Sequence, residues 1–291
     1  MSSINPQSTR RHFFKVLGVS AVSAAALGTP GLFVFDHSSL NAQAADGQEQ
    51  SNSGVSASGK GVNVLLVHGA LTDTSTWSRV IPSLQRQSYK VLAVQLPLTS
   101  LEEDIAITKQ ALATLSGPTI VVAHSYGGAV MTAAAANVAN VIGLVYIAAF
   151  APAEGESINA LFAHYPATPL LHHIVPSYRT RYVWCDPSWF PQVFAQDLDL
   201  AFARELAIGQ KPIQPGCFAT LSGPPAWKTL PSWYLVSSND HCIDPRSERF
   251  MAKRMGATTR EVASSHISPL SHPQEVLELI ADATRKGEKL S

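Results

Sequence analysis

Short runs of apolar, often β-branched residues recur along this chain and predict buried β-strands. The expected strands are 62–67, 90–96, 120–122, 141–149, 232–237 and 258–263. Between many of these runs, apolar residues recur every three or four positions, which is the spacing of an amphipathic helix. The expected helices are 77–87, 100–115, 129–138, 197–208, one from Asp244 and one from Ser271. This alternation predicts an α/β fold with a mostly parallel, doubly wound sheet and helices on both of its faces.

The alternation breaks between about residues 150 and 230, a segment that holds many of the prolines and a set of aromatic residues. An irregular insertion after a sheet strand predicts a mainly helical lid over the carboxyl ends of the strands, where open α/β sheets bind ligands. We expect most of the aromatic residues to fill the lid's own small core. The adjacent His172 and His173 are expected to face solvent.

The N-terminus has the features of an export signal. Arg10 and Arg11 precede two phenylalanines and a lysine, and a mildly apolar segment of small residues follows at 16–27. This pattern resembles a twin-arginine signal peptide. Small residues at 42–44 predict cleavage after Ala44, so that residues 1–44 would be removed. The resemblance implies a periplasmic or secreted protein whose partner during transport is the export machinery.

Residues 45–61 are mostly Gly, Ser, Gln and Asn without apolar periodicity, which predicts a flexible linker before a globular domain at 62–291. An uncleaved membrane anchor and a disordered tail are the alternatives for the leader. Glycines and a proline at residues 28–31 weaken the anchor hypothesis. We therefore expect no stable membrane anchor after processing.

Composition narrows the possible partners. The chain has 291 residues, a formal net charge of zero, 46% hydrophobic and 14% charged residues, which suits one well-buried domain. The net charge is zero, and no run of Lys or Arg occurs beyond residue 15. Both observations argue against nucleic acid or an anionic membrane as a binding partner. Three cysteines allow either a disulfide between Cys185 and Cys217, with Cys242 free, or three buried thiols. No spacing typical of a zinc site occurs, and no metal is expected.

Ser125 lies on the predicted turn between a buried strand and an Ala-rich helix. The residues two positions to either side are Ala123 and Gly127, which are small, as the tight turn of a G-x-S-x-G nucleophile elbow requires. Such a turn points Oγ away from the backbone. It also leaves the Tyr126 N–H at a helix N-terminus, where it can donate to a developing oxyanion.

The first predicted strand runs into His68-Gly69-Ala70. A strand followed by this turn is where the fold places its second oxyanion donor, so we predict the Ala70 N–H for that role. His68 directly follows a buried strand. It is expected to be a hydrogen-bonded structural side chain and not a ligand or base.

Two aspartates follow the fifth expected strand. Asp244 precedes a proline, which predicts a helix N-cap, whereas Asp240 at the strand end can orient a histidine. His266 follows the last expected strand and is the predicted base. His272 at a helix start and His241 on the acid's own turn are weaker candidates.

The order Ser125, Asp240, His266, each just beyond a predicted strand, is the order of the α/β-hydrolase fold. With the H-G-A turn and the H-S-Y-G-G elbow, the chain from 62 to about 286 resembles the small cofactor-free serine esterases of that superfamily, a group that includes plant methyl esterases and hydroxynitrile lyases. The resemblance implies a small, largely apolar carboxylic ester as substrate. It also implies an acyl-enzyme on Ser125 and no cofactor.

Alternative functions stay open. Cyanohydrin cleavage is disfavoured, because Ile267 stands where the hydroxynitrile lyases carry a lysine. Cofactor-free haloperoxidases, perhydrolases or lactone hydrolases share the same triad. A ligand-binding protein with incidental turnover is a different class, and an intact triad argues against it because capture alone needs no triad.

Overall fold

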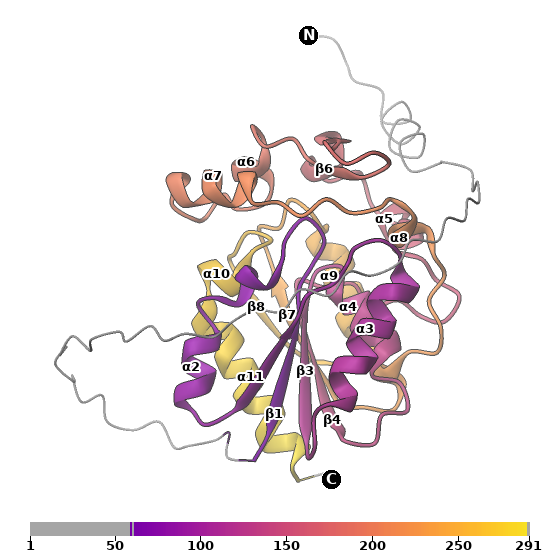
Figure 1. Ribbon diagram of the computed structural model, residues 1–291, viewed down its shortest axis with the longest axis vertical. Helices are drawn as coiled ribbons and strands as arrows, with labels where there is room; N and C mark the ends of the chain where they lie inside the picture. Colours follow the sequence, from indigo (N-terminus) through magenta and orange to yellow (C-terminus); the bar gives the residue numbers. More distant parts are fainter. Residues whose placement is uncertain (1–58, 60, 290–291) are drawn as a thin grey trace, which may run out of the picture.

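The structure is a computed structural model that describes Gly59 and residues 61–289 (Figure 1). The predicted signal peptide at 1–44 and nearly all of the predicted linker therefore lie outside the described residues. In the described part of the chain, no helix has the length and apolarity needed to cross a membrane.

A six-stranded sheet in the order β2-β1-β3-β4-β7-β8 forms the centre of the domain, and all neighbouring strands run parallel (Figure 1). The strands are β1 (Asn63–Val67), β2 (Lys90–Val94), β3 (Thr119–His124), β4 (Val141–Ile147), β7 (Ser232–Ser237) and β8 (Thr258–Val262). β1, β3, β4 and β7 are buried along their whole length, as their apolar runs predict for strands covered on both faces. Each expected strand is present, and the predicted parallel sheet is confirmed.

Helices cover both faces of the sheet. They are α2 (Ile81–Arg86), α3 (Leu101–Ala113), α4 (Gly127–Ala134), α9 (Pro245–Arg254), α10 (Ser268–Ser271) and α11 (Pro273–Gly287). Successive residues of a strand point to opposite faces, so Val121 packs in the apolar cluster that holds α4 residues, while Val122 packs in the cluster that holds α11 residues. The site described below lies where these strands end.

Some helices and one strand begin or end at other residues than the sequence predicts, and a proline or a residue with positive φ lies at these boundaries. Trp77 ends a separate 3₁₀ turn, η1 (Thr74–Trp77), and α2 begins only at Ile81, with a proline in its first turn. The helix expected from Ser271 is α11, which begins two residues later at Pro273, and a separate short helix, α10, ends at Ser271. β4 ends at Ile147, since the next residue has φ 42° and leaves the extended conformation.

The lid lies across one end of the sheet (Figure 1). Its elements are α5 (Ile158–Ala163), η2 (Pro169–His172), β5 (Ile174–Pro176), β6 (Val183–Cys185), α6 (Phe190–Val193), α7 (Leu200–Ile208), α8 (Gly216–Ala219) and η3 (Ala226–Lys228). The antiparallel pair β5–β6 is absent from the sequence prediction, because three-residue strands are too short to show a period. His172 is exposed as expected, but His173 is half-buried and stacks on Trp189 with ring centroids 4.0 Å apart.

All three cysteines are buried free thiols, so of the two alternatives the Cys185–Cys217 disulfide is wrong. Burial raises the pKa of the Cys185 thiol and that of the Cys217 thiol to about 12. Cys242 donates from Sγ to the Val193 carbonyl oxygen at 3.1 Å, which links the core to the lid.

Candidate active site

The structure brings together the three side chains that the sequence indicated. Ser125 Oγ lies 2.8 Å from His266 Nε2, and His266 Nδ1 lies 2.5 Å from Asp240 Oδ2. Ser125 follows β3, Asp240 follows β7 and His266 follows β8, and all three are buried. Because a carboxylate only accepts, Nδ1 carries the proton and donates to Asp240, which leaves Nε2 free to accept from the serine hydroxyl.

Close packing explains the small residues of the elbow. Ser125 has φ 54°, and the turn packs closely on Val67 at the end of β1 and on His68. A Cβ on Gly127 would lie 2.5 Å from the His68 carbonyl oxygen, and a Cβ on Gly128 would lie 2.4 Å from the Phe150 carbonyl oxygen. No real Cβ makes contacts this short, so both positions need glycine.

The two predicted oxyanion donors flank the serine. α4 begins at Gly127, so Tyr126 is at the N-cap, where a backbone N–H has no partner within the helix. Among the described residues, neither the Ala70 nor the Tyr126 N–H donates to another backbone group. A Cβ on Gly69 would lie 2.7 Å from Ser125 Cβ, which shows how closely the turn that carries Ala70 packs on the elbow.

His68 has the structural role expected from its position. The Leu96 N–H donates to Nε2 at 2.9 Å, so Nδ1 carries the proton and donates to the Gly69 carbonyl oxygen at 2.8 Å. Burial lowers the pKa of His68 to about 4 and keeps the ring neutral. The side chain therefore holds the oxyanion turn against the segment after β2.

The two aspartates make the contacts that their positions predict. Asp240 Oδ1 accepts from the backbone N–H groups of Cys242 and Ile243, at 2.5 and 2.9 Å, while Oδ2 faces the histidine. Asp244 caps α9 and accepts from the Arg246 N–H at 2.8 Å. The backbone thus holds the Asp240 carboxylate rigidly, and Asp244 is used by its own helix.

The other two candidate histidines do not contact the serine. His241 Nδ1 lies 3.2 Å from the Gln192 carbonyl oxygen. His272 is at the N-cap of α11, and its Nδ1 lies 3.6 Å from Asp197 Oδ2. Both bind the lid.

Two lid side chains that the sequence analysis missed hold the loops of the acid and the base. Asp197 Oδ2 accepts from the Ser265 N–H at 2.8 Å, next to His266. Gln196 Nε2 donates to the Asn239 carbonyl oxygen at 2.6 Å, next to Asp240. These partners are 68 and 43 positions apart, so no local pattern signals them.

The Tyr126 side chain serves the elbow and not the cavity. Its hydroxyl donates to Asp104 Oδ2 at 2.6 Å, and Asp104 Oδ1 accepts from the Leu98 N–H at 2.9 Å. Burial raises the pKa of Asp104 and raises that of Tyr126 well above the usual value. This pair joins the start of α4 to α3.

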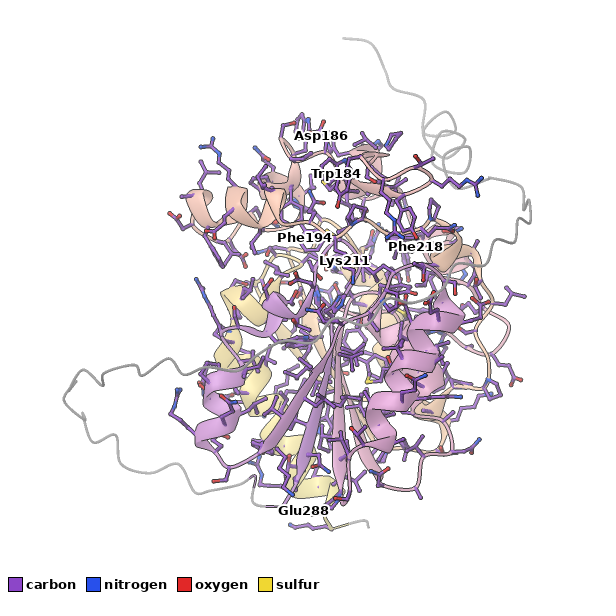
Figure 2. All side chains as sticks on the ribbon, in the orientation of Figure 1. Trp184, Asp186, Phe194, Lys211, Phe218 and Glu288 are labelled. Atoms are coloured by element: carbon purple, nitrogen blue, oxygen red, sulfur yellow. The ribbon has the colours of Figure 1, made fainter. Side chains whose placement is uncertain are left out.

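An apolar cavity opens onto Ser125. Its empty volume is about 530 Å³, counted to its open mouth. Lid and core both contribute apolar lining, which includes Phe150, Phe162, Leu170, Ile174, Val183, Phe194, Ile213 and Phe218. Figure 2 shows Phe194 and Phe218 between the lid and the sheet, and the Phe194 ring meets that of His266 edge-on with centroids 4.8 Å apart. Among the residues that line this cavity, only the His266 imidazole and the Cys242 thiol are ionisable acids or bases.

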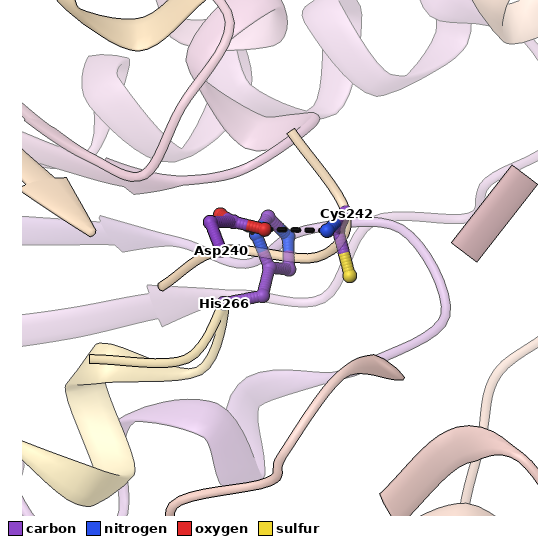
Figure 3. A group of neighbouring side chains, drawn as sticks. All are labelled: Asp240, Cys242 and His266. Carbon is purple, nitrogen blue, oxygen red and sulfur yellow. Dashed lines mark hydrogen bonds and ion pairs between the residues drawn. The ribbon is translucent and has the colours of Figure 1, made fainter. Parts of the chain in front are cut away.

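Asp240, Cys242 and His266 place potential metal-ligand atoms within 4.8 Å of one another (Figure 3). Their present bonds do not fit a metal site. The carboxylate and the imidazole are bonded to each other, and Cys242 Sγ donates to Val193. Burial raises the pKa of that thiol well above its usual value, which favours the thiol over the thiolate. The donor set is that of a hydrogen-bonded acid and base.

The comparisons agree with this fold. The model of the alpha/beta hydrolase family matches residues 64–279, and the chain belongs to this family. The probable hydrolase R7 of Phoma sp. is 24% identical over an alignment of 246 residues that covers 75% of this chain and 96% of that protein. A pyrethroid hydrolase from Sphingobium faniae JZ-2 has TM-score 0.66 and 23% identity, covering 77% of this chain and 98% of its own. Polyneuridine aldehyde esterase has TM-score 0.67 and 16% identity, with the same coverage of 77% and 98%.

Proposed function

We propose that the protein is a serine hydrolase that cleaves a small, largely apolar carboxylic ester through an acyl-enzyme on Ser125. The observation that carries this proposal is the continuous hydrogen-bond chain from Ser125 through His266 to Asp240, at the edge of an apolar cavity. Hydrolysis is also named for the pyrethroid hydrolase, and ester cleavage is named for polyneuridine aldehyde esterase.

In the proposed reaction, His266 Nε2 takes the proton of Ser125 Oγ as the oxygen attacks the acyl carbon. Asp240 keeps Nδ1–H in place and stabilises the imidazolium that forms. The N–H groups of Ala70 and Tyr126 donate to the oxyanion. The imidazolium then protonates the leaving alcohol, and water, activated by the same histidine, releases the acid.

The cavity lining supports an apolar substrate. Burying a permanent charge without a partner is costly, and the lining offers no carboxylate, ammonium or guanidinium group to pair with one. The empty space of about 530 Å³ includes open solvent at the mouth, so it is an upper bound on the room for a substrate. We therefore propose that the acyl and alcohol groups that enter this cavity are small and uncharged.

The purified chain is expected to hydrolyse p-nitrophenyl acetate and butyrate with steady-state turnover, and to discriminate against a p-nitrophenyl ester that carries a free carboxylate. Initial rates across this ester panel test the proposal, with Ser125→Ala as the background. Stoichiometric binding of an apolar ester without turnover would favour a binding role instead. Halide oxidation by peroxide without ester hydrolysis would favour the haloperoxidase alternative.

We further propose export by the twin-arginine route, on the basis of Arg10 and Arg11 ahead of the apolar segment. Replacing both with lysine is expected to leave unprocessed protein in the cytoplasm. Cell fractionation and N-terminal sequencing measure this, with Arg285→Lys as a matched control elsewhere in the chain. Normal processing near residue 45 in the double variant would contradict the proposal.

A further inference from the structure

A fully buried glutamate lies behind the candidate triad. Glu248 belongs to α9, which packs on β7, and none of its surface is exposed to solvent. Its Oε2 accepts from the Ser237 N–H at 3.1 Å, at the end of β7. Its Oε1 is also buried and has no hydrogen-bond partner among the described residues if the carboxyl is taken as ionised. A buried acceptor without a donor is rare and costs free energy, so this oxygen needs an explanation.

The Asp240 carboxylate lies within hydrogen-bonding reach of the Glu248 carboxyl. Ser237 at the end of β7 binds both residues. Its N–H donates to Glu248 Oε2 at 3.1 Å, and its carbonyl oxygen accepts from the Asp240 backbone N–H at 3.2 Å. Two carboxylates cannot form a hydrogen bond with each other, but a carboxylic acid can donate to a carboxylate. A proton on Oε1 would supply the missing partner.

The other groups around Glu248 do not neutralise a negative charge. Tyr234 is buried on β7, and its hydroxyl donates to the Ala149 carbonyl oxygen. The Cys242 thiol is buried with a raised pKa. Arg249 has the right sign, but its guanidinium is largely exposed and pairs with Glu261. An ionised Glu248 would be an unpaired buried charge, and burial beside Asp240 raises its pKa well above the usual value.

We propose that Glu248 is a positioning residue for the triad acid: it is protonated in the folded protein and donates from Oε1 to the Asp240 carboxylate. Asp240 then receives hydrogen bonds from Cys242, Ile243, His266 and Glu248. An added donor holds the carboxylate and reduces its basicity, which lowers the stability of the imidazolium on His266. Glu248 would thereby tune the pH at which the base is active. This catalytic consequence rests on the proposed function.

Two variants at the same position separate the donor from the bulk of the side chain. Glu248→Gln keeps a donor for Asp240 and an acceptor for Ser237, so the acid limb of the kcat/KM profile is expected within about 0.3 pH units of the wild type. Glu248→Met fills the space without a donor. Its acid limb is expected to move up by about one pH unit, since Asp240 becomes more basic, and kcat is expected to fall more than KM changes.

The opposite results would overturn the proposal. If Glu248 were ionised, Glu248→Gln would remove a negative charge near His266 and move the acid limb to lower pH. A wild-type profile for Glu248→Met would show that the donor has no role.

A second measurement needs no substrate. Glutamate in an unfolded chain ionises near pH 4.3, so a protonated Glu248 binds one more proton in the folded state than in the unfolded state above that pH. We expect the equilibrium constant for unfolding, measured with urea between pH 5 and 7, to rise with pH in the wild type. The ratio of the wild-type constant to that of Glu248→Gln should increase about tenfold per pH unit. Parallel curves would mean that the folded protein holds Glu248 ionised. Because this readout is independent of turnover, a failure of the proposed esterase activity would leave it intact.

Discussion

Replacing Ser125 with alanine is expected to lower kcat/KM for ester hydrolysis by at least about four orders of magnitude, because the attacking atom is lost while the rest of the site remains. The fold should survive. Alanine keeps the Cβ that packs against Gly69, and the elbow with φ 54° strains both residues alike. Steady-state kinetics and thermal unfolding of the purified variant measure the two effects.

Ser116→Ala is a matched control, because this serine is exposed at the opposite end of β3 and should leave both quantities unchanged. A fluorophosphonate probe gives an independent check. Mass spectrometry should find its adduct on Ser125 in the wild type and on no residue of the variant. Residual hydrolysis close to the wild-type rate would remove Ser125 from the mechanism.

Local chemistry made the sheet and the residues of the candidate triad predictable. β3 and β4 are apolar runs that burial on both faces favours, and only small residues fit the turn around Ser125. The choice between the two aspartates was also local, because a proline after Asp244 predicts a helix cap. Each of these signals lies within a few residues of the feature that it predicts.

What the sequence did not predict depends on contacts between distant segments. Asp197 and Gln196 bind loops that are far away in the sequence, and their own surroundings in the sequence are those of an ordinary lid helix start. Glu248 lies on an amphipathic helix, where a glutamate is usually solvated, yet it faces β7. The pairing of β5 with β6 joins two three-residue segments across an intervening turn. Only the folded chain places these groups together.

The lid thereby has two roles in the proposed enzyme. It supplies much of the apolar lining of the cavity, and it also holds the loops that carry Asp240 and His266. The Cys242 carbonyl oxygen accepts from the Thr168 hydroxyl at 3.0 Å, which adds a bond between the acid's loop and the lid. We therefore expect the geometry of the acid and base to depend on a closed lid.

Asp240→Asn is expected to lower kcat/KM by about three to four orders of magnitude with the fold retained. Asp240 uses one oxygen for the N–H groups of Cys242 and Ile243 and the other for His266 Nδ1–H. An asparagine has one acceptor oxygen, so its NH₂ group must face one set of donors. If the NH₂ group faces the backbone, the N–H groups of Cys242 and Ile243 lose their acceptor. If it faces the histidine, it favours the tautomer with the proton on Nε2, which cannot accept from Ser125.

Asp244→Asn is the matched control for this substitution, four positions further along the chain. Asparagine caps a helix about as well as aspartate, and the ion pair with Arg246 lies at the surface, where such pairs contribute little. We expect the free energy of unfolding to fall by at most about 1 kcal/mol and kcat/KM to stay near the wild-type value. Kinetics and urea unfolding of both variants decide the assignment. A large rate loss in the Asp244 variant alone would make Asp244 the acid, and equal small losses would mean that neither aspartate orients His266.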